Sequence, residues 1–293
     1  MFEMELKFFN EDMSFPFFIQ YGYHSGDFFR HIHKDFTELV IVMEGTTSHL
    51  VGEDTHLVKK GDVFVVGSNT EHEYKDSRNF QLCNIMFKPD FFFYNTFHIK
   101  EAAGFHALFY IEPYMTKEYV FKSRFRLKEK EYRLVYSLLE KMMAEYHSKL
   151  EGWKEMIHSA FTELVVYLSR NYNMPEDTKE QGIIQIANAV SFIEKNYKLP
   201  ITVKEIADTA YLSERHFTRI FKETYQFTPM QYVIRLRLIY GAELLKNTGE
   251  TVTEIALLCG FPDNNYFARK FKSFYHFSPS EYRNKYLNKN FSA

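Results

Sequence analysis

The sequence predicts a two-domain protein of the α+β class, with an N-terminal β-barrel followed by a helical hairpin and an all-helical C-terminal domain. Three observations support this prediction. The 293 residues exceed what one ordinary core supports, short strand patterns fill much of the first ninety residues, and about the last ninety contain an internal repeat. We place the barrel at residues 1–126, the hairpin at 127–172, a linker at 173–182 and the helical domain at 183–288.

The composition is that of a folded protein from a reducing compartment. Hydrophobic residues make up 45% of the chain and charged residues 25%, with only 12 Gly and 8 Pro. Cys83 and Cys259 are too few and too far apart to form a disulfide framework. The sequence has neither a signal-peptide pattern at its start nor an apolar run of membrane-spanning length. We therefore expect a cytoplasmic protein with no membrane partner.

The barrel is predicted from short strand patterns between Asp27 and about Lys88. The runs FTELVIVMEG, TSHLVG, THLVKKGDVFVVG and FQLCNIMFK are separated by Gly, Asn and Asp turn signals. Several short strands at close spacing indicate a β-sandwich or a small barrel.

Polar residues in these strands form a candidate ligand site. His31 and His33 alternate along a strand and so share one face, and Glu38 and His72 follow. Three histidines and one glutamate could hold a divalent metal ion, although we expect no cofactor. Alternatively, the histidines only form hydrogen bonds in the barrel mouth or on its surface, or the barrel mouth binds a polyol effector, whose hydroxyls need paired donors and acceptors. The candidate effector-binding residues are Arg30, His33, Glu38, His72 and Asn84.

The spacing of these residues resembles the two cupin motifs. The first extends from Gly26 to Gly45 as G-x4-H-x-H-x4-E-x6-G, and the second runs from Gly61 to His72. The resemblance implies a cupin-like barrel that holds a metal ion or an organic effector. Gly67 and Asn69 depart from the residues that the second motif usually has, and the first spacer is one residue short.

Two amphipathic helices are predicted to follow the barrel. Leu134, Leu138 and Met142 share a stripe in the first, and Trp153, Ile157, Phe161, Leu164 and Leu168 mark the second. The apolar face of this hairpin is wide enough to cover the barrel and also to pair with a second chain, so we expect a homodimer; packing on the barrel alone is the alternative. The polar stretch Asn173–Gly182 then reads as a linker.

Charge separates the two halves of the chain. Residues 183–293 carry 15 Lys and Arg against 10 Asp and Glu, whereas residues 1–182 carry 21 against 28. A basic half joined to an acidic half is expected when one domain meets a polyanion.

The internal repeat is the strongest signal in the sequence. Val203–Tyr232 aligns with Val252–Tyr282, with Pro262 as one extra residue, and twelve of thirty positions are identical where chance gives about two. Capping boxes at Thr202 and Thr251 start a short helix in each copy, and N-cap candidates Ser213 and Asp263 start a second helix. Each copy therefore predicts a helix-turn-helix.

The second helix of each copy has an apolar stripe and a polar stripe. Phe217, Ile220 and Phe221, and likewise Phe267 and Phe271, are predicted core residues. Arg can bind guanine bidentately, Asn can bind adenine and Lys favours phosphate, so the polar stripes suit the major groove of DNA. An ordinary solvated helix face is the alternative, but its recurrence in both copies argues against it. The stripe residues are Arg215, Thr218, Arg219 and Lys222 in the first copy and Asn265, Ala268, Arg269 and Lys272 in the second.

A long helix joins the two copies. Thr228–Gln231 is a further capping box, and the helical pattern continues to about Lys246, which corresponds to roughly 27 Å. Such a spacer can present two recognition helices to successive major-groove segments about 34 Å apart. Ser278–Glu281 repeats the cap and starts a closing helix.

From about Ile186 to Tyr286 the chain resembles the DNA-binding domain of AraC/XylS-type bacterial transcription regulators, on segments such as LSERHFTRIFKETYQFTPMQYVIRLRL and TVTEIALLCGFPDNNYFARKFKSFYHFSPSEYR. The resemblance implies that the second helix of each motif enters the major groove, which adds His216 and Asn264 to the candidate contacts. Tyr211 lies where many members have a turn glycine, so we expect a strained or differently shaped turn there. The run NFQLCNIMFKPDFF resembles the sugar-responsive members, in particular the rhamnose regulators.

The sequence thus predicts a DNA-binding transcription regulator, which we expect to be an activator, that responds to a small-molecule effector such as a carbohydrate and acts with RNA polymerase. We do not expect an enzyme, since the chain has no Gly-rich phosphate loop, no Ser nucleophile motif and no zinc-protease signature. The alternatives are a metal-dependent cupin enzyme fused to a DNA-binding domain, and a DNA-binding dimer that needs no effector.

Overall fold

A computed structural model describes residues 2–52, 54–93, 99–117, 125–172 and 181–290. The chain divides into two compact units, Met1–Ala187 and Asn188–Ala293. This boundary falls inside helix α6 (Gln181–Asn196). Most of the expected linker lies outside the described residues, and its last two residues belong to α6.

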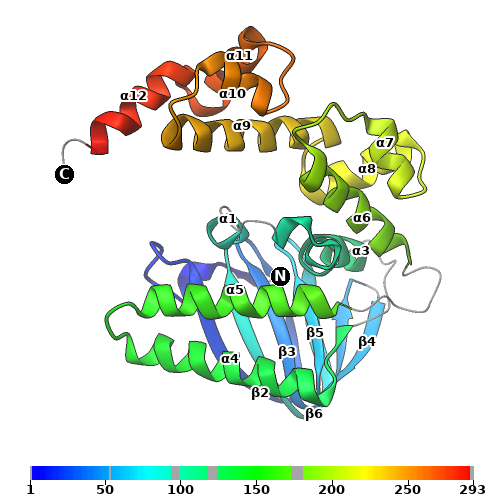
Figure 1. The fold of residues 1–293 in the computed structure, drawn as a ribbon. Coiled ribbons are helices and arrows are strands. Elements are labelled where there is room, and N and C mark those ends of the chain that lie inside the picture. Colours follow the sequence, from blue (N-terminus) through cyan, green and yellow to red (C-terminus); the bar gives the residue numbers. More distant parts are fainter. Residues whose placement is uncertain (1, 53, 94–98, 118–124, 173–180, 291–293) are drawn as a thin grey trace. The chain divides into compact units, whose positions relative to one another are not determined.

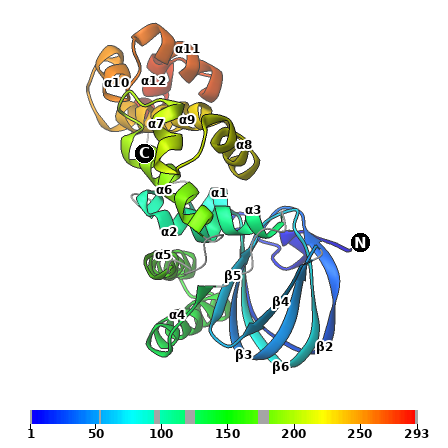
Figure 2. The same cartoon turned by 90° about the vertical axis from the view of Figure 1, so that its right-hand side faces the viewer.

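The N-terminal unit is built on one curved seven-stranded sheet (Figures 1 and 2). The strand order is β1-β2-β6-β3-β5-β7, and β4 pairs with the second half of β3. Among the described strands, β1 and β2 pair in parallel and the other pairs are antiparallel. The strands are β1 (Phe2–Met4), β2 (Phe17–His33), β3 (Thr37–Val51), β4 (Asp54–Lys59), β5 (Asp62–Val66), β6 (Glu71–Phe87) and β7 (Phe125–Arg126).

Several of the expected turns are irregularities inside long strands. Strand β3 continues through Gly45 and β6 through Asp76 and Asn79, all three with positive φ. A Cβ on Gly45 would lie 2.2 Å from the carbonyl oxygen of Asn79, so only glycine fits this crossing. The prediction of short strands separated by turns is wrong here, because the turn-forming residues bend continuous strands through bulges.

One side of the sheet holds an apolar core. Val40 and Val42 of β3, Phe64 of β5, and Phe80 and Leu82 of β6 are fully buried within one cluster. Because successive side chains of a strand point to opposite sides, their neighbours Ile41 and Cys83, which are also fully buried, lie on the other side of the sheet.

The predicted helical hairpin is present as α4 (Glu129–Ser148) and α5 (Trp153–Asn171). The hairpin packs on the sheet: the Phe161 ring lies 4.9 Å from that of Phe87 and 5.7 Å from that of Phe17, between centroids. Leu138 and Met142 are buried, whereas Leu134 is 38% exposed. Short elements precede the hairpin: η1 (Leu6–Phe8), α1 (Pro89–Phe92), η2 (Ile99–Glu101), α2 (Ala103–His106), η3 (Ala107–Ile111) and α3 (Glu112–Lys117).

Helices alone form the described part of the C-terminal unit. After α6 come α7 (Val203–Thr209), α8 (Glu214–Tyr225), α9 (Pro229–Asn247), α10 (Val252–Leu258), α11 (Asn264–Tyr275) and α12 (Pro279–Asn290). The predicted capping boxes are formed, since Glu205 accepts a 2.8 Å hydrogen bond from the Thr202 amide, and Glu254 accepts one of the same length from that of Thr251. Among the described helices, none is long and apolar enough to cross a membrane.

Candidate nucleic-acid interface and sensor site

The two helix-turn-helix units have the same turn. In both, the amide of the residue after the turn donates to a carbonyl five residues back: Leu212 to Ala207 in the first copy, and Phe261 to Ala256 in the second. The residue at the turn has positive φ, +54° for Tyr211 and +85° for Gly260. Tyr211 therefore adopts the strained conformation expected from the sequence, and its side chain is 84% exposed.

The second helices of the two units, α8 and α11, are anchored by the aromatic residues that the sequence predicted. Phe217 and Phe221 of α8 and Phe267 and Phe271 of α11 are fully buried. Ser213 caps α8 by accepting from the His216 amide at 3.3 Å, and Asp263 caps α11 by accepting from the Tyr266 amide at 2.7 Å.

Most of the predicted DNA-contacting side chains are solvent-exposed. Arg219 forms a 3.1 Å ion pair with Glu223 one turn later, and the Arg269 guanidinium lies 5.4 Å from the Tyr266 ring centroid. Asn264 is partly buried, and its buried side-chain oxygen has no hydrogen-bond partner. The exposed set is Arg215, His216, Arg219, Lys222, Asn265, Arg269 and Lys272, while Thr218, Asn264 and Ala268 are partly buried.

Sequence reasoning missed Tyr266, which borders the candidate surface. Together with Pro262, Asp263, Asn265 and Arg269, it lines a hollow of about 500 Å³ at the start of α11. Tyr266 occupies the position of His216 in the repeat alignment, which could have identified it.

Helix α9 connects the two copies of the repeat. It has 19 residues and is therefore about 28 Å long. The Arg235 guanidinium lies 5.3 Å from the Phe227 ring, just after α8, and 5.4 Å from the Phe274 ring in α11. The buried Arg237 donates to the carbonyl of Leu199 at 2.7 Å. Helix α9 therefore contacts both helix-turn-helix units.

In the N-terminal unit, the candidate metal residues converge. His31 and His33 lie on the same face of β2, and His31 is paired with His72 across the strands. One ring nitrogen from each of the three histidines lies within 4.8 Å of the others. The Nε2 atoms of His33 and His72 are 3.2 Å apart, and a Glu38 oxygen lies 4.0 Å from Nε2 of His33.

Outer hydrogen bonds orient two of these rings. Nδ1 of His31 lies 3.0 Å from the Phe29 carbonyl, and Nδ1 of His72 lies 3.0 Å from Nε2 of His49, a residue that sequence reasoning did not select. Nδ1 of His33 and one Glu38 carboxyl oxygen are buried without a hydrogen-bond partner. Imidazoles with one nitrogen engaged and the other facing a common point are arranged as in metal sites.

Burial controls the protonation of this cluster. Removal from water lowers the pKa of His33 to about 3 and raises the pKa of Glu38 to about 8. The imidazole of His33 is therefore neutral at pH 7, the state that can ligate a metal ion, and a bound cation would favour the ionised Glu38 carboxylate.

The other two expected effector-binding residues, Asn84 and Arg30, are arranged differently from His33, Glu38 and His72. Asn84 is buried and its side-chain oxygen has no hydrogen-bond partner, but Arg30 is exposed and pairs with Glu73 at 2.8 Å and Glu71 at 3.2 Å. The expectation that Arg30 joins His33, Glu38 and His72 does not agree with this position, because the two glutamates of β6 hold its guanidinium at the surface.

Comparisons with known proteins assign both units. Residues 16–150 match the AraC-like ligand binding domain, and residues 206–285 match a helix-turn-helix domain. The chain is 25% identical over 274 residues to the HTH-type transcriptional activator RhaR of Mannheimia succiniciproducens, covering 94% of both chains. It is 29% identical over 255 residues to the activator RhaS of Escherichia fergusonii, covering 86% of both.

Similarity to solved structures is also found. The C-terminal domain of the two-component response regulator yesN from Fusobacterium nucleatum is 30% identical, with a TM-score of 0.32, over 32% of this chain and 93% of that one.

Proposed function

Because the chain belongs to the AraC family of transcription regulators, we propose that it reads two neighbouring major-groove segments of DNA with α8 and α11 and that a small-molecule effector bound by its N-terminal unit controls this activity. The observation that carries the proposal is the duplication. In each copy two phenylalanine side chains are buried, and an Arg and a Lys at equivalent positions are exposed to solvent.

Each exposed side chain receives a role from its chemistry. Arg219 and Arg269 occupy equivalent positions one turn into their helices and are suited to bidentate recognition of guanine. Lys222 and Lys272, near the helix ends, suit phosphate oxygens. Arg215, His216, Thr218, Asn264, Asn265 and Ala268 complete the proposed base-facing surface.

The test uses the full-length protein. Duplexes are selected from a random DNA library, and affinity for the enriched site is measured by gel shift at two salt concentrations. The proposal expects an enriched pair of half-sites bound far more tightly than unrelated DNA. Enrichment of a single half-site, or of none, would contradict it.

A second candidate function concerns the histidine cluster. We propose that His31, His33, Glu38 and His72 hold a divalent metal ion, because three ring nitrogens converge and a buried carboxyl oxygen lies beside them without a partner. The ion would fasten β2 to β3 and β6. Elemental analysis of the purified protein, followed by thermal unfolding with Zn²⁺ and with EDTA, tests this. A metal-free protein whose melting temperature Zn²⁺ leaves unchanged contradicts it.

We further propose that the protein acts in the cytoplasm as a homodimer and that it regulates transcription together with RNA polymerase rather than as an enzyme. The exposed Leu134 of α4 would form part of the dimer contact. Light scattering should give twice the chain mass, and Leu134→Asp should shift the protein toward the monomer.

A further inference from the structure

The two copies of the repeat hold their equivalent arginines by different groups. The Arg219 guanidinium of α8 pairs with the Glu223 carboxylate at 3.1 Å, and the two side chains are 60% and 41% exposed. The guanidinium carbon of Arg269 in α11 instead lies 5.4 Å from the ring centroid of Tyr266, within the range of a cation–π contact. A carboxylate therefore holds the first arginine, and an aromatic ring holds the second.

The repeat alignment shows that neither copy has both holding groups. His216 takes the place of Tyr266 in the first copy, and Ser273 takes the place of Glu223 in the second. Serine carries no charge, so α11 offers Arg269 no carboxylate one turn later. The difference between the two arginines therefore follows from the sequence of each copy.

The surroundings of the Tyr266 ring hold it in place. The ring is partly buried against the core cluster of the second helix-turn-helix unit, and its centroid lies 5.8 Å from that of the buried Phe261 ring. The Tyr266 amide donates to the Asp263 carboxylate at 2.7 Å, which caps the first turn of α11. Tyr266 thus gives the Arg269 guanidinium a fixed surface to lie on.

The two holding groups have different consequences for base recognition. A ring face attracts a guanidinium and leaves the N–H donors at its edge available to guanine. A carboxylate takes up N–H donors that guanine needs. Arg269 is therefore in position to read a base before DNA arrives, whereas Arg219 must first leave Glu223.

We infer that Tyr266 is a positioning residue that holds Arg269 for guanine recognition and that Glu223 restrains Arg219, so that the two helix-turn-helix units read DNA unequally. This inference rests on the proposed function, because it presupposes that α8 and α11 enter the major groove. Tyr266 and Arg269 both line the hollow at the start of α11, so a base edge that enters it meets the positioned guanidinium. At the other half-site, breaking the ion pair is part of the binding reaction.

The first experiment measures base preference by gel shift, with the full-length protein and duplexes that carry single substitutions in the selected DNA. The base pair read by Arg269 is the one whose substitution no longer changes the affinity of Arg269→Ala. Tyr266→Leu should reduce the preference for guanine at this position about threefold or more, whereas Tyr266→Phe, which keeps the ring, should change it less than about twofold. In the Arg269→Ala background, Tyr266→Leu should have no further effect on affinity.

Tyr240→Leu in α9 is the matched control for Tyr266→Leu. Tyr240 packs against the same core cluster, and its ring centroid lies 3.7 Å from the Lys198 ammonium. The control therefore removes an equivalent cation–π contact outside α11 and should leave the guanine preference unchanged. Thermal unfolding checks that each variant is folded.

The second experiment neutralises Glu223 and compares two duplexes in one competition reaction, with and without the guanine read by Arg219. Glu223→Gln should raise the preference for this guanine about twofold, because the arginine no longer has to leave an ion pair in order to bind it. Glu243→Gln makes the same change in charge and removes a 3.1 Å ion pair with Lys246 in α9. This control should leave the preference unchanged.

Distinct results overturn each half of the inference. An unchanged preference in Tyr266→Leu, or a loss that Tyr266→Phe or Tyr240→Leu shares, overturns the role of Tyr266, and so does a further loss of affinity in the Arg269→Ala background. A Glu223→Gln variant that binds all sequences more tightly by the same factor overturns the restraint on Arg219. Either result alongside specific DNA binding by the wild type sinks only this inference, whereas a wild type without specific DNA binding sinks the proposed function.

Discussion

Substitutions at the two equivalent turns of the repeat should have opposite effects on stability. Tyr211 and Gly260 occupy the same place in the same hydrogen-bonded turn, and both have positive φ. Tyr211→Gly should stabilise the C-terminal unit, since it removes a Cβ from a left-handed conformation. Gly260→Ala should destabilise it, since it introduces one.

The structure sets the two magnitudes. A left-handed conformation costs a residue with a Cβ about 1–2 kcal/mol, which glycine avoids. Glycine in turn loses about 0.5–1 kcal/mol of stability because its unfolded chain has more conformational entropy. Because the Tyr211 side chain is 84% exposed, little packing is lost. A net gain of about 0.5–1 kcal/mol is expected. At Gly260 the new Cβ would lie 2.3 Å from the Lys198 carbonyl oxygen, so backbone displacement adds to the strain and we expect a loss of at least about 2 kcal/mol.

Urea unfolding of the full-length variants, followed by far-UV circular dichroism, measures the free energies, and hydrogen exchange of peptides from α7–α8 and α10–α11 locates the change. A loss of stability in Tyr211→Gly comparable with that in Gly260→Ala would refute the reasoning, because it would show that the side chain at the first turn contributes more than its backbone strain costs.

Three further predictions concern DNA binding and acid stability. Arg219→Ala and Arg269→Ala should each cost about 1–3 kcal/mol in specific binding and relax the preference for one base pair, as measured by gel shifts with single-substitution duplexes; unchanged affinity in both variants would count against the assignment. Lys222→Ala should weaken binding to all sequences alike and reduce the slope of log affinity against log salt by about 1, whereas a base-specific effect would argue against a phosphate contact. Burial lowers the pKa of His106 to about 3, so its contribution to stability is complete above pH 6.5 and is lost as the pH falls from 6.5 toward 3. Over that window this group should lower the free energy of unfolding by up to about 1.4 kcal/mol per pH unit. In urea titrations at several pH values, His106→Gln, which can still donate to the Lys100 carbonyl, should remove this contribution to the slope. An unchanged slope would mean that His106 does not titrate as inferred.

Helical features of the C-terminal unit could be predicted from sequence because they depend on neighbouring residues. The Thr202 and Thr251 capping boxes, the Ser213 and Asp263 caps and the Thr228 box before α9 each lie within four residues. Because the motif occurs twice, each of its helices could be predicted from two separate segments. Burial of Phe217 and Phe267 followed from helical spacing alone.

The sheet was harder to predict, because its long strands depend on pairing between distant residues. Gly45 and Asn79 are of residue types that are typical of turns. They nevertheless face one another across β3 and β6 and bend both strands without ending them. Periodicity within one segment carries no information on such a crossing.

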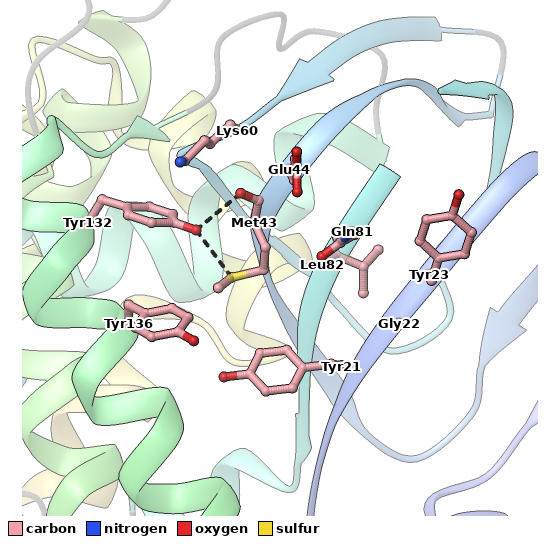
Figure 3. A pocket seen from close by; sticks show the side chains of 10 residues that line it. All are labelled: Tyr21, Gly22, Tyr23, Met43, Glu44, Lys60, Gln81, Leu82, Tyr132 and Tyr136. Atoms are coloured by element: carbon pink, nitrogen blue, oxygen red, sulfur yellow. Dashed lines mark hydrogen bonds between the residues drawn. The ribbon is translucent and has the colours of Figure 1, made fainter. Parts of the chain in front are cut away.

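The histidine cluster and the pocket between the sheet and α4 shown in Figure 3 also differ in how far apart their residues lie in the sequence. His31, His33 and Glu38 are close in sequence, so their convergence with His72 could be anticipated from strand alternation and motif spacing. Tyr21 and Tyr136 line the pocket and are more than a hundred residues apart, and the bulge of β3 at Met43, which also lines it, is a product of strand register. The sequence carried no signal for the pocket, and only the packing of α4 on the sheet assembles it.

The central claim is that α8 and α11 enter two successive major-groove segments of one duplex. Hydroxyl-radical footprinting of the full-length protein on its selected DNA tests this most directly. The account predicts two protected segments about one helical turn apart on the same face, with Arg219→Ala weakening one and Arg269→Ala the other. A single protected segment, or loss of the same segment in both variants, would contradict it.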